Sequence, residues 1–87
     1  MQIIKRDGSR QEFNKQKIAR VVHSAGLSQE ESHVLANKIE EWIKKQASEN
    51  KKVNSLEIKD QVSKLLKQEN EYAWGLYSWY ENIKSKN

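Results

Sequence analysis

Three basic residues near the amino terminus, Lys5, Arg6 and Arg10, are the first candidates for chemistry in this chain. They flank Asp7-Gly8, a dipeptide that favours a tight chain reversal because both residues tolerate positive φ. The residues on either side predict two short antiparallel strands, so the three cations gather at one end of a small hairpin. Such a cluster favours binding of a polyanion. The alternative is that these long side chains are simply solvated on an exposed hairpin.

The expected loop also predicts how the two strands pair. A two-residue loop at Asp7-Gly8 places Lys5 directly opposite Arg10 on the same face of the hairpin. Like charges in that position destabilise a sheet, and a bound phosphate chain would relieve the repulsion. Because side chains alternate along a strand, Lys5 and Arg6 lie on opposite faces. Both reach one ligand only if they converge around the strand edge or the turn.

The composition indicates one small folded domain. The chain has 87 residues, of which 36% are apolar and 32% are charged, and its net charge is +4. The apolar residues recur periodically, which favours a folded domain over a disordered segment. The lack of cysteine excludes disulfides, thiolate metal sites and cysteine nucleophiles, and it suits a reducing compartment. No apolar run approaches the ~20 residues of a membrane span, so we expect a soluble, cytoplasmic protein without a membrane partner.

Apolar periodicity and capping residues predict four helices, at about 14–25, 28–47, 54–68 and 70–84. Ser28 with Glu31, and Asn54 with Glu57, have the spacing of capping boxes. Gly26 is placed to end the first helix in a left-handed conformation. The helices follow a hairpin over residues 2–13.

The predicted fold class is therefore α+β and mainly α, with an N-terminal β-hairpin capping a small four-helix bundle in a single domain, 1–87. Two strands alone are only marginally stable in water. The hairpin must therefore pack on the helices, and Ile3, Ile4 and Phe13 are its expected anchors.

The last helix is unusually aromatic. Five of the seven aromatic residues lie between Tyr72 and Tyr80. Side chains at Trp74 and Trp79 point about 140° apart on a helix, so a single groove does not bury both. Some of these aromatics must cover the bundle, while others are available as anchors for a partner. We expect a partner interface at Trp74, Tyr77 and Trp79, and the alternative is that they all serve the core.

Several segments together resemble the ATP-cone, a regulatory nucleotide-binding domain found in ribonucleotide reductases. The opening Ile3-Ile4-Lys5-Arg6-Asp7-Gly8, with Phe13-Asn14 and Lys17-Ile18 after it, is similar to the start of that domain. Residues 55–62, Ser-Leu-Glu-Ile-Lys-Asp-Gln-Val, are similar to the entry of its third helix. Tyr77 and Tyr80 match the tyrosine pair of its last helix. The resemblance covers roughly residues 2–81.

This resemblance implies a site for ATP or dATP, accompanied by Mg²⁺, between the hairpin and the helices. The implied nucleotide-binding residues are Ile3, Lys5 and Arg6 on the first strand, Gln11 and Asn14 near the base or sugar, Lys17 at the phosphates, and Ser55 and Lys59 on the third helix. The first turn of a helix attracts phosphate through its free N–H groups and positive dipole end, which supports the placement of Ser55. Gln11 stands where the family commonly has an acidic residue.

The expected function is that of a non-catalytic module that binds ATP or dATP and regulates a ribonucleotide reductase through nucleotide-dependent assembly. Its partners would be adenine nucleotides and either further copies of itself or a reductase subunit. No nucleophile–base pair, phosphate-binding P-loop or metal-ligand cluster is present in the sequence, so we expect neither catalytic nor metal-binding residues. The chain fits a stand-alone cone or an excised N-terminal domain.

Two other functions are compatible with the sequence. A degenerate cone that has lost its ligand would act only in protein interactions, and the amide at Gln11 keeps this open. A small basic module that binds nucleic acid is disfavoured, because the lysines and arginines are spread over every helix and alternate with glutamates.

Overall fold

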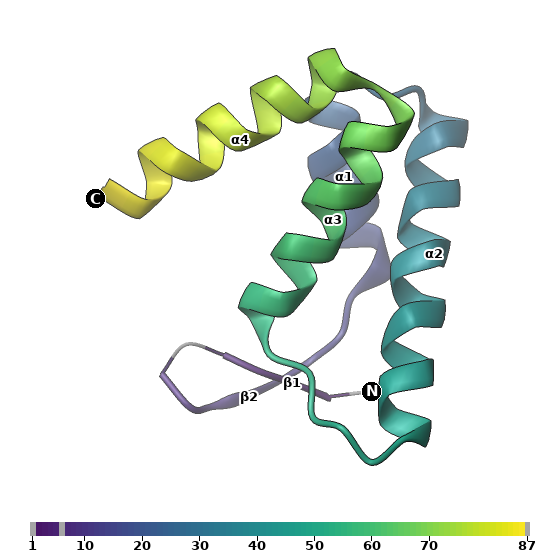
Figure 1. Ribbon diagram of the computed structural model, residues 1–87, viewed down its shortest axis with the longest axis vertical. Helices are drawn as coiled ribbons and strands as arrows, with labels where there is room; N and C mark the ends of the chain where they lie inside the picture. Colours follow the sequence, from purple (N-terminus) through teal and green to yellow (C-terminus); the bar gives the residue numbers. More distant parts are fainter. Residues whose placement is uncertain (1, 6, 87) are drawn as a thin grey trace.

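The computed structural model describes residues 2–5 and 7–86, with side chains as far as Glu81. Two strands, β1 (Gln2–Ile4) and β2 (Arg10–Glu12), precede four helices. The helices are α1 (Lys15–Ser24), α2 (Gln29–Ser48), α3 (Ser55–Glu69) and α4 (Glu71–Lys86) (Figure 1). This architecture confirms the predicted fold class, which is mainly α with an N-terminal antiparallel hairpin. None of the helices in the described part of the chain is long and apolar enough to cross a membrane.

The hairpin lies across one end of the three helices α1, α2 and α3 (Figure 1). Helices α1 and α3 both begin at this end, whereas α2 begins at the far end and finishes near the hairpin. Helix α4 also begins at the far end. It packs against α3, and its second half diverges from the other helices (Figure 1). Two helix N-termini are therefore directed at the hairpin.

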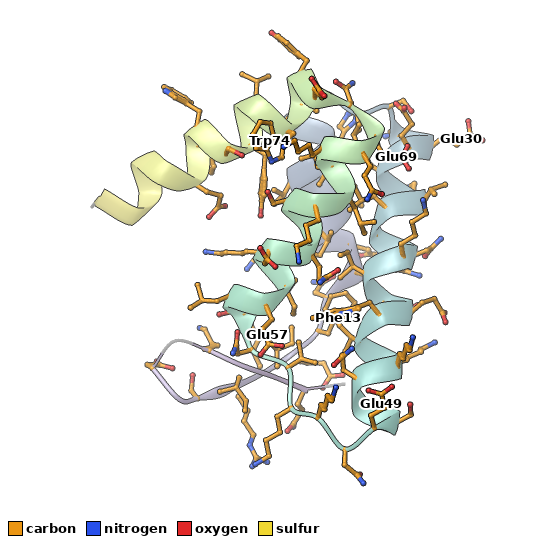
Figure 2. All side chains as sticks on the ribbon, in the orientation of Figure 1. Phe13, Glu30, Glu49, Glu57, Glu69 and Trp74 are labelled. Atoms are coloured by element: carbon orange, nitrogen blue, oxygen red, sulfur yellow. The ribbon has the colours of Figure 1, made fainter. Side chains whose placement is uncertain are left out.

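The core is formed by one apolar stripe from each helix and one strand residue, Ile3. Val53 and Ile58, on either side of the Asn54 cap, are both buried, as expected of a hydrophobic staple. Phe13 packs against the core and lies between the hairpin and the helices (Figure 2). Other members of the core are Val22, Leu27, Leu35, Ile39, Ile43, Val62, Leu66, Ala73 and Tyr77.

The C-terminus of α1 and the N-terminus of α2 show why one helix stops here and the next begins. Gly26 has φ +127°, and the N–H of Leu27 bonds to the carbonyl of Val22 at 3.2 Å, which is the Schellman pattern of a helix end. Two residues later the Ser28 hydroxyl accepts from the N–H of Glu31 at 3.1 Å, and the Glu31 carboxylate accepts from the N–H of Ser28 at 2.9 Å. The sequence predicted both the helix end at Gly26 and the capping box of Ser28 with Glu31.

The register of the hairpin differs from the prediction by one residue. Ile4 lies opposite Arg10, and the N–H of Lys5 donates to the carbonyl of Ser9 at 2.8 Å. The predicted pairing of Lys5 with Arg10 is therefore wrong, and so is the repulsion inferred from it. The connection from Lys5 to Ser9 spans three residues, one more than predicted.

The chemistry of the turn explains this longer loop. Gly8 adopts φ +88° and donates its N–H to the carbonyl of Lys5 at 3.0 Å, as in three-residue hairpin loops that end on a left-handed glycine. The Asp7 carboxylate accepts from both the N–H and the hydroxyl of Ser9, at 2.9 and 2.6 Å. These bonds stabilise the turn locally. Arg6, one of the predicted site residues, lies outside the described residues.

A substitution at Gly75 tests whether this residue lies in an open, helical part of α4. A methyl group added there meets nothing within 4 Å, so Gly75→Ala should stabilise the fold by roughly 0.5–1 kcal/mol through helix propensity. Urea unfolding followed by circular dichroism measures the change. Gly26→Ala is the matched control, and it should destabilise the fold because φ +127° strains any side chain. Destabilisation by Gly75→Ala would contradict the open, helical environment of this residue.

Candidate functional site

The hairpin is attached to α3 by a backbone pairing outside its own two strands. The N–H of Ile4 donates to the carbonyl of Val53 at 3.0 Å, and Ile4 forms a parallel bridge with Asn54. The segment before α3 therefore lies beside β1, joined to it by a single β-bridge. Since Asn54 is the N-cap of α3, this pairing places the first turn of α3 next to the strand that leads to Lys5.

The second helix N-terminus at this end belongs to α1, which begins three residues after β2. The Asn14 side chain caps it by accepting from the N–H groups of Gln16 and Lys17, at 3.0 and 3.3 Å. No acidic residue lies in its first turn. Lys17 lies there instead, exposed and without an ion-pair partner among the described residues. A cation at the positive end of a helix dipole is unfavourable, so this turn attracts an anion.

One face of the hairpin is directed towards the helices. Residues paired across antiparallel strands share a face, so Ile3 and Gln11 lie on the same face as Lys5 and Ser9. Ile3 is buried in the core, whereas Gln11, directly opposite it, and Lys5, two residues after it, are exposed. The structure thus places an ammonium and an amide beside a buried apolar residue on one face of the hairpin.

Asp7 is engaged in the turn. Hydrogen bonds from the hydroxyl and then the N–H of Ser9 hold the pKa of Asp7 below its usual value of 3.8. Desolvation opposes this shift, and the charge of Lys5 adds to it. The carboxylate is therefore ionised throughout the neutral range. Its oxygens are directed to the loop backbone and Ser9, and Lys5 forms no ion pair in the part of the chain that is described.

The start of α3 adds two further predicted site residues. Asn54 supplies the cap, with its oxygen accepting from the N–H of Glu57 at 2.8 Å and its amide donating to the Glu57 carboxylate at 2.8 Å. Ser55, half-buried at the first position of α3, is therefore not needed for capping. Lys59 lies one turn later, and its Nζ is 3.3 Å from Oε2 of Glu81 on α4.

The predicted site residues therefore fall into three groups around one end of the molecule. Lys5 and Gln11 lie on the hairpin beside Ile3, and the others lie near the starts of two helices: Asn14 and Lys17 at α1, and Ser55 and Lys59 in the first and second turns of α3. Sequence reasoning missed the pairing of Ile4 with Val53, because nothing local to either segment signals it. It also missed Glu81 as the partner of Lys59.

The three aromatics predicted at a partner interface occupy different environments. Trp74 is half-buried, donates from Nε1 to the Ser63 hydroxyl at 2.9 Å, and carries the Lys67 ammonium 4.8 Å from its ring centroid (Figure 2). Tyr77 is 7% exposed and belongs to the core. Burial, followed by the nearby charge of Glu81, raises its pKa well above the usual range. Trp79 is 63% exposed.

An exposed apolar surface continues from Trp79 along α4 and onto α1. It includes Tyr72, Leu76 and Tyr80. Between this part of α4 and the outer side of α1 lies an open groove of about 420 Å³, lined by Arg20, Val21, Ser24, Ala25, Leu76, Trp79 and Tyr80. This surface is far more apolar than the hairpin end, so the two regions suit different kinds of ligand.

The chemistry available at the hairpin end is binding of an anion. The described residues hold no cluster of three or more His, Cys, Asp or Glu side chains that could ligate a metal ion. Of the two histidines, His23 has its Nδ1 2.8 Å from the carbonyl of Leu27, a contact that belongs to the end of α1. The groups around the hairpin are ammonium groups, amides and two helix N-termini, together with the carboxylates of Asp7, Glu12 and Glu57. Asp7 and Glu57 are held by local hydrogen bonds.

Comparison with protein-family models matches residues 1–86 to the ATP cone domain. A search of curated proteins finds no match to the chain.

Proposed function

This chain belongs to the ATP-cone family, a family of nucleotide-binding regulatory domains typical of ribonucleotide reductases, and on that premise we propose that it is a non-catalytic sensor of ATP and dATP. The proposal rests on the arrangement at the hairpin end: α1, with Lys17 in its first turn, and α3 both begin at the end of the molecule where the hairpin that carries Lys5 lies (Figure 1). Free N–H groups, dipole ends and ammonium groups all stabilise phosphate. The site thus suits a triphosphate, the part that all such effectors share.

The triphosphate would lie between the hairpin face and the first turns of α1 and α3. Lys5 and Lys17 approach it from two sides, with Arg6 and Lys59 completing the positive charge, and the Ser55 hydroxyl donates a hydrogen bond. Mg²⁺ would accompany the nucleotide, held mainly by phosphate oxygens and water. Each charge-assisted hydrogen bond of this kind contributes about 1.5–3 kcal/mol when its partner is present.

The base and sugar would lie near the two amides, above Ile3. The Asn14 oxygen already accepts two backbone N–H groups, so its Nδ2 is the group that can donate to a ribose hydroxyl or a base nitrogen. Gln11 is exposed and has both a donor and an acceptor. An amide of this kind matches an adenine edge, which also presents one donor and one acceptor.

The response to the nucleotide would be a change of assembly in the cytoplasm, through further copies of the chain or a reductase subunit. The exposed face of α4 supports this, because large aromatics such as Trp79 are favoured anchors in interfaces. Trp74 and Tyr77 pack inwards and would set the angle at which α4 presents that face. A coupling of about 1–3 kcal/mol between nucleotide and assembly is enough to shift the equilibrium substantially.

The same exposed face supports the second candidate, a cone that has lost its ligand and serves only as an interaction module. The two candidates share the α4 surface and differ at the hairpin, so nucleotide binding separates them.

Titration of the purified chain with MgATP, MgdATP, MgGTP and a short DNA duplex tests nucleotide binding. We expect heat of binding and a raised Tm with the adenine nucleotides only, since a ligand at 100 times its Kd stabilises by about 2.7 kcal/mol. Lys5→Ala and Lys17→Ala should each weaken binding by about tenfold or more through a lost charge-assisted contact. Lys38→Ala is the matched control, because Lys38 pairs with Glu69 at 3.2 Å, away from the hairpin.

Unchanged affinity in both lysine variants would place the nucleotide elsewhere. No binding of any nucleotide would favour the interaction module. Salt-dependent binding of DNA without nucleotide preference would favour the nucleic-acid module.

Sedimentation velocity with and without ATP or dATP tests the proposed response. We expect one adenine nucleotide to shift the wild-type chain to a larger assembly, and Trp79→Ala to abolish that shift while nucleotide affinity is retained. Val34→Ala removes an apolar side chain of comparable exposure on α2 and should assemble like the wild type. A single, unchanging species with saturating nucleotide would contradict self-assembly, and wild-type assembly of Trp79→Ala would contradict the role of α4.

A further inference from the structure

A polar stripe runs along α3 from its contact with α4 to its N-terminus beside the hairpin. Residues four apart on a helix share a face, and Ser55, Lys59, Ser63 and Lys67 follow this spacing. Ser55 lies at the first position of α3, next to the Asn54 cap that is paired with β1. The stripe thus connects the proposed nucleotide site with the surface that supports α4.

Side chains of α4 contact three of the four residues of this stripe. Ser63 and Lys67 hold Trp74, by a hydrogen bond of 2.9 Å and a cation–π contact of 4.8 Å. One turn nearer the hairpin, the Lys59 ammonium pairs with the Glu81 carboxylate at 3.3 Å. One part of the stripe therefore holds α4, and the other part, at Ser55, lies at the proposed nucleotide site. Lys59 lies between these two parts.

The ion pair between Lys59 and Glu81 is partly exposed to solvent, so a ligand can compete for it. The Lys59 side chain is 53% exposed, so a phosphate can reach it, whereas the Glu81 side chain is 24% exposed. Glu81 also lies within electrostatic reach of the Tyr77 hydroxyl, one helical turn earlier, and Tyr77 is part of the core. Glu81 thus lies close to a residue that packs α4 onto the core.

We propose that Lys59 is a shared ligand, held by Glu81 in the free protein and claimed by the triphosphate when a nucleotide binds. Glu81 is then a positioning residue that lowers nucleotide affinity and links occupation of the site to the placement of α4. This inference rests on the proposed function, because it requires that a triphosphate occupy the hairpin end.

Competition follows from charge and distance. An ammonium has three N–H donors, so Lys59 could in principle bond to both anions. A carboxylate and a triphosphate on the same ammonium would nevertheless lie only a few ångströms apart, and like charges at that distance repel strongly near a protein surface. Binding of the nucleotide therefore favours release of Glu81, and by linkage any change that holds Glu81 on Lys59 weakens nucleotide binding equally.

The expected effect is modest and has a definite sign. Half-exposed ion pairs are weak, so Glu81→Gln should tighten MgATP binding by about threefold. The gain should disappear in a Lys59→Ala background, because no ammonium is then left to compete for. Structural damage at α4 would lower affinity, so an increase that depends on Lys59 distinguishes competition from damage.

Isothermal titration of MgATP into the wild type, Glu81→Gln, Lys59→Ala and the double variant tests this inference. The matched control is Glu69→Gln, which removes the same charge and breaks the Lys38–Glu69 pair of 3.2 Å at the end of α3 far from the hairpin (Figure 2). Measurements in about 0.15 M salt, where the Debye length is about 8 Å, suppress the general effect of added positive charge. Glu69→Gln should match the wild type.

Two kinds of failure are distinguishable. Absence of MgATP binding by the wild type overturns the proposed function, and this inference with it. Wild-type binding that Glu81→Gln leaves unchanged or weakens, or a gain that persists without Lys59 or is matched by Glu69→Gln, overturns the shared-ligand inference alone.

Discussion

The hydrogen bond from the N–H of Ile4 to the carbonyl of Val53, 3.0 Å long, joins the hairpin to the segment that leads into α3. Two short strands are only marginally stable by themselves. The pairing with the segment before α3 adds a β-bridge to β1, while Ile3 anchors the same strand in the core. The hairpin is thereby held beside the first turn of α3, and every role assigned to Lys5 and Ser55 depends on that placement.

The electrostatic design of the helix ends differs between the two ends of the molecule. At the far end, α2 begins with a Ser28 cap followed by Glu30 and Glu31, which suit the positive end of its dipole. At the hairpin end, α1 has a neutral Asn14 cap and no acidic residue in its first turn, whereas α3 has Glu57 beside its Asn54 cap. Glu30 lies far from the hairpin, as Figure 2 shows. A bound anion would supply at α1 the negative charge that the sequence itself provides at α2 and α3.

Helix α4 takes part in both halves of the proposed mechanism. Its inward side chains, Trp74 and Tyr77, fasten it to α3 and the core, while Trp79 remains exposed. The ion pair between Lys59 and Glu81 adds a contact nearer to the hairpin. Because that contact involves the same α3 stripe as Ser55, the site and the exposed face of α4 are joined by one helix rather than by a long chain of contacts.

The sequence predicted what local chemistry determines. The caps at Ser28 and Asn54 and the helix end at Gly26 are contained within a few neighbouring residues, and the structure confirms them. The hairpin register was mispredicted because Ser9 bonds to Asp7 and stabilises a three-residue loop, a side-chain effect that the Asp-Gly dipeptide does not reveal.

Contacts between distant segments were beyond a local reading of the sequence. The pairing of Ile4 with Val53 and the ion pair of Lys59 with Glu81 each join residues far apart in the chain. No local sequence pattern around these residues indicates which distant residue each of them contacts. The sequence therefore indicated candidate phosphate-binding side chains, whereas the structure was needed to show which of them lie at the same end.

Backbone amide shifts in ¹H–¹⁵N NMR spectra during a MgATP titration test the central claim most directly, because each amide reports on its own surroundings. The account predicts that the largest changes occur together at Lys5, Ser9, Lys17 and Ser55, while amides at the far end of the bundle, such as that of Glu30, stay unchanged. Changes confined to the groove between α1 and α4, at Val21 and Leu76, would contradict it.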